Sequence, residues 1–320
     1  MPFFPFYDTI VAMKRFVLID SLALIHRAYH ALPPLTTSRG EQVNAVYGFA
    51  TMLLRVIDDL KPEFIAAAFD KKTPTFRHIE YKEYKAKRPP MDEALKPQIP
   101  LAKKFVEAMG IAEFELDGYE ADDIIGTLSQ KVTDGEIPAD EVYIVTGDRD
   151  TLQLVTPKIK IYTTRQKISE VVIYDEAAIK EKYGLLPTQI VDYKALTGDQ
   201  SDNIPGVHGI GEKTAQSLLQ KYNSLEGVYA HIETIDESVR KKLIEGKESA
   251  LLSKNLATIV RNVPIEVKLE ALELRELHKD KVIKYLENLE FTSLVRRFKG
   301  EESGKKEVKK SDGNEQLTFI

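Results

Sequence analysis

The sequence has no cysteine among its 320 residues. Disulfides, thiolate nucleophiles and cysteine-bound zinc are therefore excluded, which fits a reducing compartment such as the cytoplasm. No apolar run approaches the roughly 18 residues that a membrane helix needs. Residues 1–12 carry Asp8 within their apolar part, and the basic residues come only at Lys14 and Arg15, the wrong order for a signal peptide. We expect residues 1–12 to be an N-terminal extension, with Met13 as an alternative start.

Recognisable pairs of a nucleophile and a base are also missing. The six histidines are scattered without the spacing of metal ligands, and His208 fits a turn better than a catalytic role. The formal net charge of −5 argues at first sight against a nucleic-acid partner. Hydrophobic and charged contents of 43% and 30% are those of a globular protein, and the length predicts about two domains.

Short apolar runs alternate with amphipathic stretches in the first half of the chain. The runs at 15–20, 63–70 and 141–148 have the length of strands, and the stretches at 45–60 and 99–110 have helical periodicity. Continuous apolar strands that alternate with helices predict a mostly parallel sheet covered on both faces. The fold class is therefore α/β.

Each of the three predicted strands ends in an aspartate, at Asp20, Asp70 and Asp148. Aspartate is a common residue after strands and at helix caps, which is the simpler interpretation of any one of them. Ligand sites in parallel sheets lie beyond the carboxyl ends of the strands, so the three together predict a shared site. Asp150 follows Asp148 at a spacing that puts both side chains on one side of an extended chain.

A second group of acids opens a predicted helix in the stretch "YEADDIIG" (119–126). Acids in a first turn complement the helix dipole, which explains one or two of them but hardly three at such close spacing. The stretch "TGDQSDNIPG" adds two more acids three residues apart, in what is otherwise a polar turn. Crowded carboxylates become favourable around a divalent cation such as Mg2+. Nine acids suit a two-metal site: Asp20, Asp70, Glu120, Asp122, Asp123, Asp148, Asp150, Asp199 and Asp202.

The remainder of the chain is mildly basic, since removing nine negative charges from −5 leaves +4. From Lys71 to Arg88 the chain holds seven Lys or Arg against two acids, with three interleaved aromatics. A solvated amphipathic helix would have this pattern, but basic and aromatic groups together also suit phosphates and unpaired bases. We expect DNA contacts from this segment, at Arg77, Lys82 and Lys87 among others.

The stretch "GVHGIGEKTAQSLL" (206–219) is a second candidate for phosphate binding. It is not a Walker A loop, because Glu212 separates Gly211 from Lys213, and no predicted strand precedes it as a dinucleotide fingerprint requires. It fits a helix–turn–helix hairpin whose glycines let a helix N-terminus approach a phosphate.

Five ordered motifs resemble the 5′-nuclease (flap endonuclease) family, with the closest likeness to the N-terminal 5′→3′ exonuclease domain of bacterial DNA polymerase I. They are "VLIDSLALIHRAYHALPPL", "AAAFDKKTPTFRHIEYKEYKAKRPPM", "GYEADDIIGTL", "VTGDRDTLQLV" and "LTGDQSDNIPGVHGIGEKTAQSLL". The resemblance runs from about Lys14 to about Lys299. It departs from the family pattern in Ser21, where a glycine is usual, and in Arg149, where a lysine is common.

The resemblance implies roles for individual residues. The nine acids match the family's metal ligands, and Lys85 and Arg88 match the arch residues that contact the scissile phosphate. Arg27 matches the arginine after the first strand, and Tyr84 the aromatic before the arch lysine. The family's helix-two-turn-helix binds duplex backbone with a monovalent cation such as K+, and it matches Gly206, Gly209, Gly211, Lys213 and Thr214.

The implied function is a structure-specific 5′ nuclease in DNA replication and repair, cytoplasmic and associated with the nucleoid. It would use two Mg2+, with Mn2+ as a substitute, on DNA with 5′ flaps, nicks or free 5′ ends and on RNA–DNA primers. A non-catalytic flap-binding module of the same fold and a PIN-type ribonuclease are the alternatives. The chain ends at residue 320 without a polymerase region, which predicts a stand-alone nuclease, a fragment of a larger polymerase being the other interpretation.

The predicted organisation has four parts. After the extension come a PIN/resolvase-like α/β nuclease core (13–184) with a helical arch near 71–100 and a helical subdomain (185–299) with the helix-two-turn-helix. Residues 300–320 form a charged, disordered tail. The tail ends in "QLTFI", which resembles sliding-clamp-binding peptides through Gln316, Leu317, Phe319 and Ile320. An apolar terminus that frays or packs on its own domain is the alternative.

Overall fold

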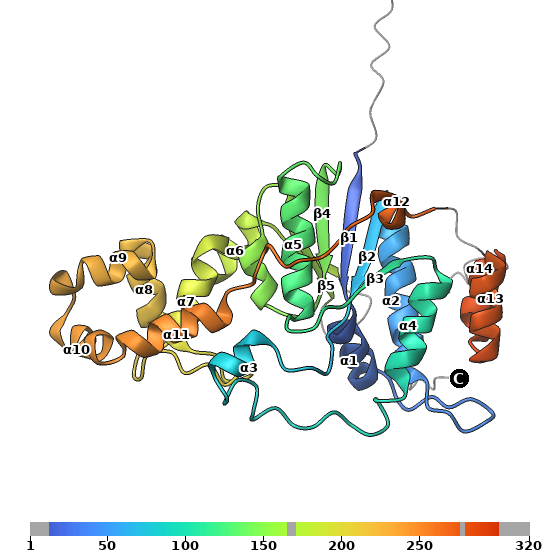
Figure 1. Ribbon diagram of the computed structural model, residues 1–320, viewed down its shortest axis with the longest axis horizontal. Helices are drawn as coiled ribbons and strands as arrows, with labels where there is room; N and C mark the ends of the chain where they lie inside the picture. The colour runs from blue at the N-terminus through green and yellow to red at the C-terminus, as the bar shows by residue number, and fades with distance from the viewer. Residues whose placement is uncertain (1–12, 165–170, 276–278, 301–320) are drawn as a thin grey trace, which may run out of the picture.

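A computed structural model describes residues 13–164, 171–275 and 279–300 (Figure 1). The predicted extension and clamp-binding peptide lie outside the described residues. One sheet has the strand order β3-β2-β1-β4-β5-β6. The strands are β1 (Arg15–Asp20), β2 (Phe64–Ala68), β3 (Ala112–Phe114), β4 (Glu141–Val145), β5 (Ile159–Thr164) and β6 (Val171–Tyr174).

Strands β1 to β5 pair in parallel, and β6 is antiparallel to β5. The predicted mostly parallel α/β sheet is therefore confirmed. The strand order reverses between β1 and β4, which are neighbours although a long stretch of chain separates them. A crevice at such a reversal, outside the carboxyl ends of the strands, is where ligands bind in open α/β sheets.

Alternation along the central strands builds two cores, one on each face of the sheet. Val17 and Ile19 of β1 point into one core, and Phe16 and Leu18 point into the other, all almost fully buried. Helices α1 (Ser21–Ala31), α2 (Asn44–Leu60) and α4 (Gln98–Ala108) cover the first face, and α5 (Ala121–Thr133) with the 3-10 helix η1 (Asp150–Leu154) covers the second.

Helices after the sheet form a subdomain with its own apolar core, in which Leu219 and Leu243 have no exposed surface. Figure 1 shows this subdomain beside the sheet, on the far side from α4. Its helices are α7 (Ile190–Thr197), α8 (Glu212–Tyr222), α9 (Leu225–Ala230), α10 (Glu237–Glu245) and α11 (Lys247–Ala257), with 3-10 turns η2 (Pro187–Gln189) and η3 (Ile232–Thr234). Helix α6 (Glu176–Tyr183), which precedes them, buries Ile179 in the core on the second face of the sheet.

The chain after α11 returns to the α/β core, which the sequence did not indicate. Val263 and Leu272 pack under one face of the sheet, and Val282 and Leu286 pack with α2 and α4 on the other. This part contains α12 (Leu269–Leu272), α13 (Lys279–Asn288) and α14 (Thr292–Lys299). The expected helical subdomain over 185–299 is therefore corrected in its last part, because the apolar faces of these helices belong to the core.

The predicted arch contains one short helix, α3 (Phe76–Glu80), followed by successive turns before α4 begins. Residues 81–97, called the arch segment below, are held by bonds such as Tyr84 N–H to Tyr81 O and Arg88 N–H to Lys85 O. Figure 1 shows it crossing from the subdomain side to α4. The segment is not the continuous helix that its charge spacing favours, because Pro89 and Pro90 cannot continue a helix and Lys85 has a positive φ of 56°.

Candidate active site at the carboxyl edge of the sheet

Five carboxylates, those of four aspartates and Glu120, line one cleft of about 470 Å3 at the carboxyl edge of the sheet. Asp20 ends β1, Asp70 follows β2, Asp148 follows β4, and Asp122 lies in the first turn of α5. Glu120 is the N-cap of α5, so the cleft unites the three strand-end acids and two acids of the triplet, as the positions of the aspartates on parallel strands predict.

Hydrogen bonds from neutral donors orient three of the aspartates. Thr146 Oγ1 donates to Asp20 Oδ2 at 2.5 Å, and the Ala121 N–H donates to Asp70 Oδ1 at 2.9 Å. The Asp150 N–H donates to Asp148 Oδ1 at 2.9 Å. Neutral donors hold the carboxylates in place without cancelling their charge, so the cleft keeps a strongly negative wall.

The crowding of these carboxylates in a buried site raises the pKa values of three of them. Burial, with added repulsion from Asp70 and Asp148, raises the pKa of Asp20 to about 7. Burial and the charges of Asp148 and Asp20 raise the pKa of Asp122 well above its usual range. Burial also raises the pKa of Asp70. The cleft therefore has a strong affinity for positive charge, supplied either by protons or by a cation.

Lys194 of α7 bridges two further predicted ligands across 44 and 5 residues of sequence. Its Nζ contacts Asp150 and donates to Asp199 Oδ2 at 2.7 Å. Although burial opposes the effect, Lys194 holds the pKa of Asp199 at about 2. Burial and the Asp148 charge nevertheless raise the pKa of Asp150 to about 7. The pair of carboxylates is thus bound to a protein cation.

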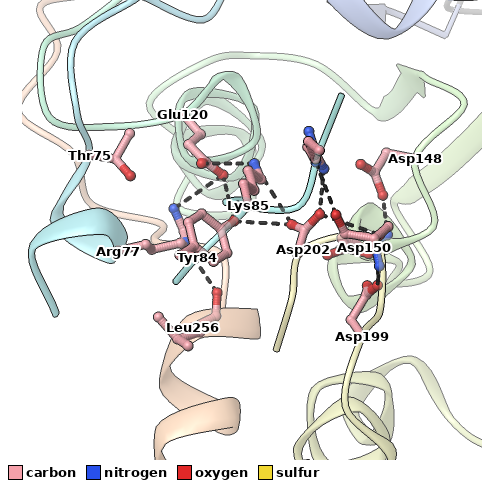
Figure 2. Close-up of polar contacts among 12 residues, drawn as sticks. Thr75, Arg77, Tyr84, Lys85, Glu120, Asp148, Asp150, Asp199, Asp202 and Leu256 are labelled. Carbon is pink, nitrogen blue, oxygen red and sulfur yellow. Dashed lines mark hydrogen bonds and ion pairs between the residues drawn. The ribbon is translucent and has the colours of Figure 1, made fainter. Parts of the chain in front are cut away.

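The arch segment supplies cations to the remaining acids (Figure 2). Lys85 Nζ donates to Glu120 Oε1 at 2.8 Å, and Arg88 forms an ion pair with Asp202. The Tyr84 hydroxyl lies 3.2 Å from Glu120 Oε2 and 3.1 Å from Asp202 Oδ2. Lys85 and Arg88, which the resemblance places at the scissile phosphate, and the neighbouring Tyr84 therefore contact two of the predicted metal ligands.

The acids suit a divalent cation by chemistry, although they are not gathered around a single point. Over residues 13–164, 171–275 and 279–300, no three carboxylates or histidines converge as a preformed metal site. Their donors are all oxygens, which is the donor set of the magnesium class, and their mutual repulsion is what such an ion relieves. That the nine acids bind two metal ions stays a prediction.

Arg77 and Asp123 bind each other in a buried pair behind the cleft, where Arg77 Nη1 also lies 3.6 Å from Glu120 Oε2. Asp123 has no exposed surface, and Arg77 is 2% exposed. Arg77 Nη1 and Nη2 donate to the two oxygens of Asp123, each at 2.8 Å. In this structure Arg77 cannot contact DNA and Asp123 has no oxygen directed at the cleft. A buried pair uses the same residue types as a phosphate contact and a metal ligand, so the sequence alone does not distinguish these roles.

The predicted duplex-binding hairpin (206–219) consists of the end of the loop between α7 and α8 and most of α8. Gly206 and Gly209 have positive φ angles of 64° and 78° in the connecting loop, and Gly211 precedes the first turn of α8. Lys213 in that turn is exposed and Thr214 is half-buried. A second cleft of about 1050 Å3 extends from Asp148 and Asp199 to Gly211 and Gln216, so it runs from the acids to this hairpin.

Other predicted residues lie around the acids. Arg27 of α1 is half-buried, and a Cβ at Gly147 would lie 3.7 Å from its Nη1, so it borders the turn that carries Asp148. Lys82 and Lys87 of the arch segment are exposed. Sequence reasoning missed Lys194 and Thr146. Lys194 stands five residues before Asp199 on a helix, a spacing that carries no signal, and Thr146 is one of many strand-end threonines.

Two family models match consecutive parts of the chain. The model of the 5′-3′ exonuclease N-terminal resolvase-like domain matches residues 15–184. The model of the 5′-3′ exonuclease C-terminal SAM fold matches residues 185–280. The chain belongs to the 5′-3′ exonuclease family. This result confirms the predicted family, and it agrees with the sheet edged by carboxylates and with the helical subdomain.

Curated relatives of this family member are DNA polymerases I. The sequence is 45% identical over 286 residues to DNA polymerase I of Caldicellulosiruptor bescii, covering 89% of this chain and 33% of that protein. It is 43% identical over 302 residues to DNA polymerase I of Bacillus subtilis, covering 93% of this chain and 34% of that protein. The chain therefore spans about a third of the length of these relatives.

Solved structures share the fold at low sequence identity. One is a bacteriophage T5 flap endonuclease in a pseudo-enzyme–product complex with DNA and metal ions, with a TM-score of 0.64, 17% identity, and coverage of 88% of this chain and 100% of that one. Another is the catalytic core of Rad2 in complex with DNA substrate, with a TM-score of 0.57, 16% identity, and coverage of 89% and 90%. These matches support the fold.

The described ranges include no helix with the length and apolar character required to span a membrane.

Neutralising Asp20 tests the electrostatics of the cleft. Because the folded-state pKa of Asp20 is raised from 3.8 to about 7, the native state binds the extra proton and this contribution to stability falls as pH rises across that window. With chelator at pH 8, Asp20→Asn should raise the free energy of unfolding by on the order of 1–3 kcal/mol. Thermal unfolding at pH 5 and pH 8 measures it, and the gain should shrink at pH 5.

Magnesium supplies the second arm of this measurement. Added Mg2+ should raise the melting temperature of the wild type more than that of Asp20→Asn. Asp134→Asn, at the exposed far end of α5, is the matched control and should behave as wild type. A wild-type protein with equal stability at both pH values and no response to Mg2+ would contradict a repulsive carboxylate cluster.

Proposed function

We propose that the chain is a structure-specific 5′→3′ exonuclease and 5′-flap endonuclease. Its substrates would be DNA with 5′ flaps, nicks or free 5′ ends and RNA–DNA primers, in replication and repair, in the cytoplasm at the nucleoid. The observation that carries the proposal is the cleft that crowds five buried or half-buried carboxylates beside Lys85 and Arg88, in a chain of the 5′-3′ exonuclease family. Acids for a cation and cations for a phosphate lie within one site.

The acids would hold two Mg2+, with Mn2+ as a substitute. A divalent ion bound there supplies charge that stabilises the developing negative charge and activates water for attack on a phosphodiester. Asp20, Asp70, Asp122 and Asp148 are the first candidates because they share the cleft wall. Asp150, Asp199, Glu120 and Asp202 would join them once their cationic partners are displaced.

Lys85 and Arg88 would exchange partners when substrate binds. In the free protein they neutralise Glu120 and Asp202, at 2.8 Å in the case of Lys85 and Glu120 Oε1. A scissile phosphate offers a stronger charge-assisted contact, and the acids left behind favour metal. The internal ion pairs therefore keep the site folded without ligand and give way to metal and phosphate together. Tyr84 and Arg27 would orient the acids around this exchange.

Duplex DNA would bind at the hairpin 206–219 while the 5′ strand passes the arch segment. Gly209, which has a positive φ, and Gly211 are exposed in the hairpin turn, so a phosphate could approach their backbone, and Lys213 adds an exposed charge beside them. A monovalent cation such as K+ would assist at this turn. Exposed Lys82 and Lys87 would attract the phosphates of the displaced strand.

Cleavage of a 5′-end-labelled flap DNA in Mg2+ tests the proposed activity. The wild type should release short labelled products with 3′-hydroxyl ends, and chelator should stop the reaction. Asp70→Ala should abolish cleavage while flap binding survives or tightens, because one negative charge facing the phosphate is lost. Asp134→Ala is the matched control on an exposed acid outside the cleft and should cleave at the wild-type rate.

The same assay separates the alternatives. Flap binding without cleavage in Mg2+ or Mn2+ would indicate a non-catalytic binding module. Cleavage of unstructured RNA with no preference for a 5′ flap would indicate a PIN-type ribonuclease, although that class lacks a long basic arch and a glycine-rich hairpin.

Lys85→Ala and Arg88→Ala test the role of the arch segment. Losing a charge-assisted contact worth about 1.5–3 kcal/mol to the scissile phosphate should slow single-turnover cleavage ten-fold or more. The Mg2+ concentration for half-maximal rate should not rise, because each variant also frees a carboxylate. Rapid-quench cleavage at saturating enzyme measures both quantities. Wild-type rates in both variants would indicate that the arch segment only attracts DNA electrostatically.

The C-terminal peptide would recruit the replication sliding clamp. Gln316, Leu317, Phe319 and Ile320 follow a run of mostly charged residues, so three apolar anchors on a tether would raise the effective concentration of the nuclease at DNA. Deleting 316–320 should leave cleavage of naked flap DNA unchanged and remove stimulation by clamp. A fluorescence titration of full-length protein with clamp checks it, and no binding at tens of micromolar would dismiss the partner.

A further inference from the structure

Arg77 and Asp123 form a buried pair in which every hydrogen-bonding atom is used. Each oxygen of Asp123 accepts one bond from the Arg77 guanidinium and one from a backbone N–H. Oδ1 accepts from Val260 at 2.9 Å, and Oδ2 accepts from Glu120 at 3.1 Å. A metal or a phosphate could bind here only by displacing these partners. The arrangement is that of a structural joint between segments.

Three segments that are far apart in sequence meet at this joint. Arg77 belongs to α3 at the base of the arch segment, and Asp123 belongs to the first turn of α5, next to the cleft. The third is the end of α11, where Arg77 Nε donates to Leu256 O at 2.9 Å and Nη2 donates to Thr258 O at 2.8 Å. Figure 2 shows Arg77 between Leu256 and the acids near Tyr84.

Helix α11 carries the other end of the connection. One turn before Leu256, Ser253 Oγ accepts from the Gly206 N–H at 2.9 Å, and Ser249 Oγ donates to Gly206 O at 2.6 Å. Gly206 is held tightly, since a Cβ there would lie 2.2 Å from the Gly198 nitrogen. A rigid helix therefore links the hairpin turn to the base of the arch segment.

Apolar contacts run along the same path. Tyr84 packs with Ile204 and Leu256 in a small buried cluster. A direct path also exists, because the Lys85 N–H donates to Asp202 O at 2.9 Å and Asn203 Nδ2 donates to Glu83 O at 2.7 Å. Variants that remove the joint at Arg77 and leave the direct path intact therefore distinguish the two connections.

We propose that Arg77 and Asp123 are positioning residues that transmit duplex binding at the hairpin, through α11, to the arch segment and to Glu120. They are then neither a DNA contact nor a metal ligand. The proposal rests on the proposed nuclease function only for its kinetic readout. The Glu120 N–H donates to Asp123, and the Glu120 carboxylate accepts from Lys85. A movement of the joint would therefore weaken or strengthen the contact that keeps Lys85 on Glu120.

The first measurement needs no variant and no cleavage. Hydrogen exchange of residues 81–97 is followed in wild-type protein with and without blunt duplex DNA, in chelator. Duplex should change the exchange of the arch segment although this DNA has no flap to occupy it. An unchanged exchange pattern at saturating duplex overturns the proposal. A change in a protein that fails to cleave flap DNA would refute the nuclease function and leave the coupling intact.

Variants then assign the coupling to the pair. Arg77→Gln, Asp123→Asn and the double variant should each slow single-turnover flap cleavage ten-fold or more, with the double no worse than the singles because one joint is lost in each. Arg77→Lys should recover part of the rate. The duplex-induced change in 81–97 should disappear. The control is Lys96→Gln with Glu93→Gln, an exposed ion pair on the same segment, which should behave as wild type.

Three results would overturn the assignment. A salt dependence of duplex binding that falls by about one in slope for Arg77→Gln would make Arg77 a phosphate contact. A ten-fold higher Mg2+ requirement for Asp123→Asn would make Asp123 a metal ligand. If duplex DNA still changed the hydrogen exchange of residues 81–97 in the double variant, the coupling would run through the direct path. Should a single variant fail to fold by its thermal unfolding curve, the charge-neutral double variant and Arg77→Lys decide.

Discussion

Repulsion among carboxylates at the carboxyl ends of β1, β2 and β4 is the constraint that shapes this molecule around its site. Asp20, Asp70, Asp122 and Asp148 share one cleft wall, and burial and mutual charge raise the pKa of Asp20 to about 7. A structure can tolerate such a wall only if positive charge is close. Lys85, Arg88 and Lys194 supply it, and each comes from a segment outside the sheet.

This distribution of charge explains why the arch segment has the conformation it does. Its basic residues have helical spacing, but Pro89 and Pro90 interrupt any helix there, and Lys85 has a positive φ. The contacts of Tyr84 and Lys85 with Glu120 fix the conformation of the turns instead. The segment is therefore ordered by the acids it covers. In a nuclease of the kind proposed, that order would be exchanged for contacts with substrate.

Much of the fold followed from the sequence because it depends on local pattern. Apolar strand runs and helical periodicity located β1, β2, β4, α2 and α4, and parallel pairing then put the strand-end acids on one edge. The partners of those acids did not follow. Asp123 looks the same in sequence as its neighbour Asp122, and only the three-dimensional structure shows that one faces Arg77 and the other faces the cleft.

The return of the chain to its starting domain has a consequence for synthesis on the ribosome. Val282, Leu286 and Phe291 complete the apolar layer formed by α2 and α4, and Glu290 accepts from the Ser38 N–H across 252 residues. Until these last helices emerge, the first domain displays an uncovered apolar face. A nascent chain that already carries every acid of the cleft thus still lacks the helices that cover this apolar face. The first domain would complete its folding only after Phe291 has been synthesised.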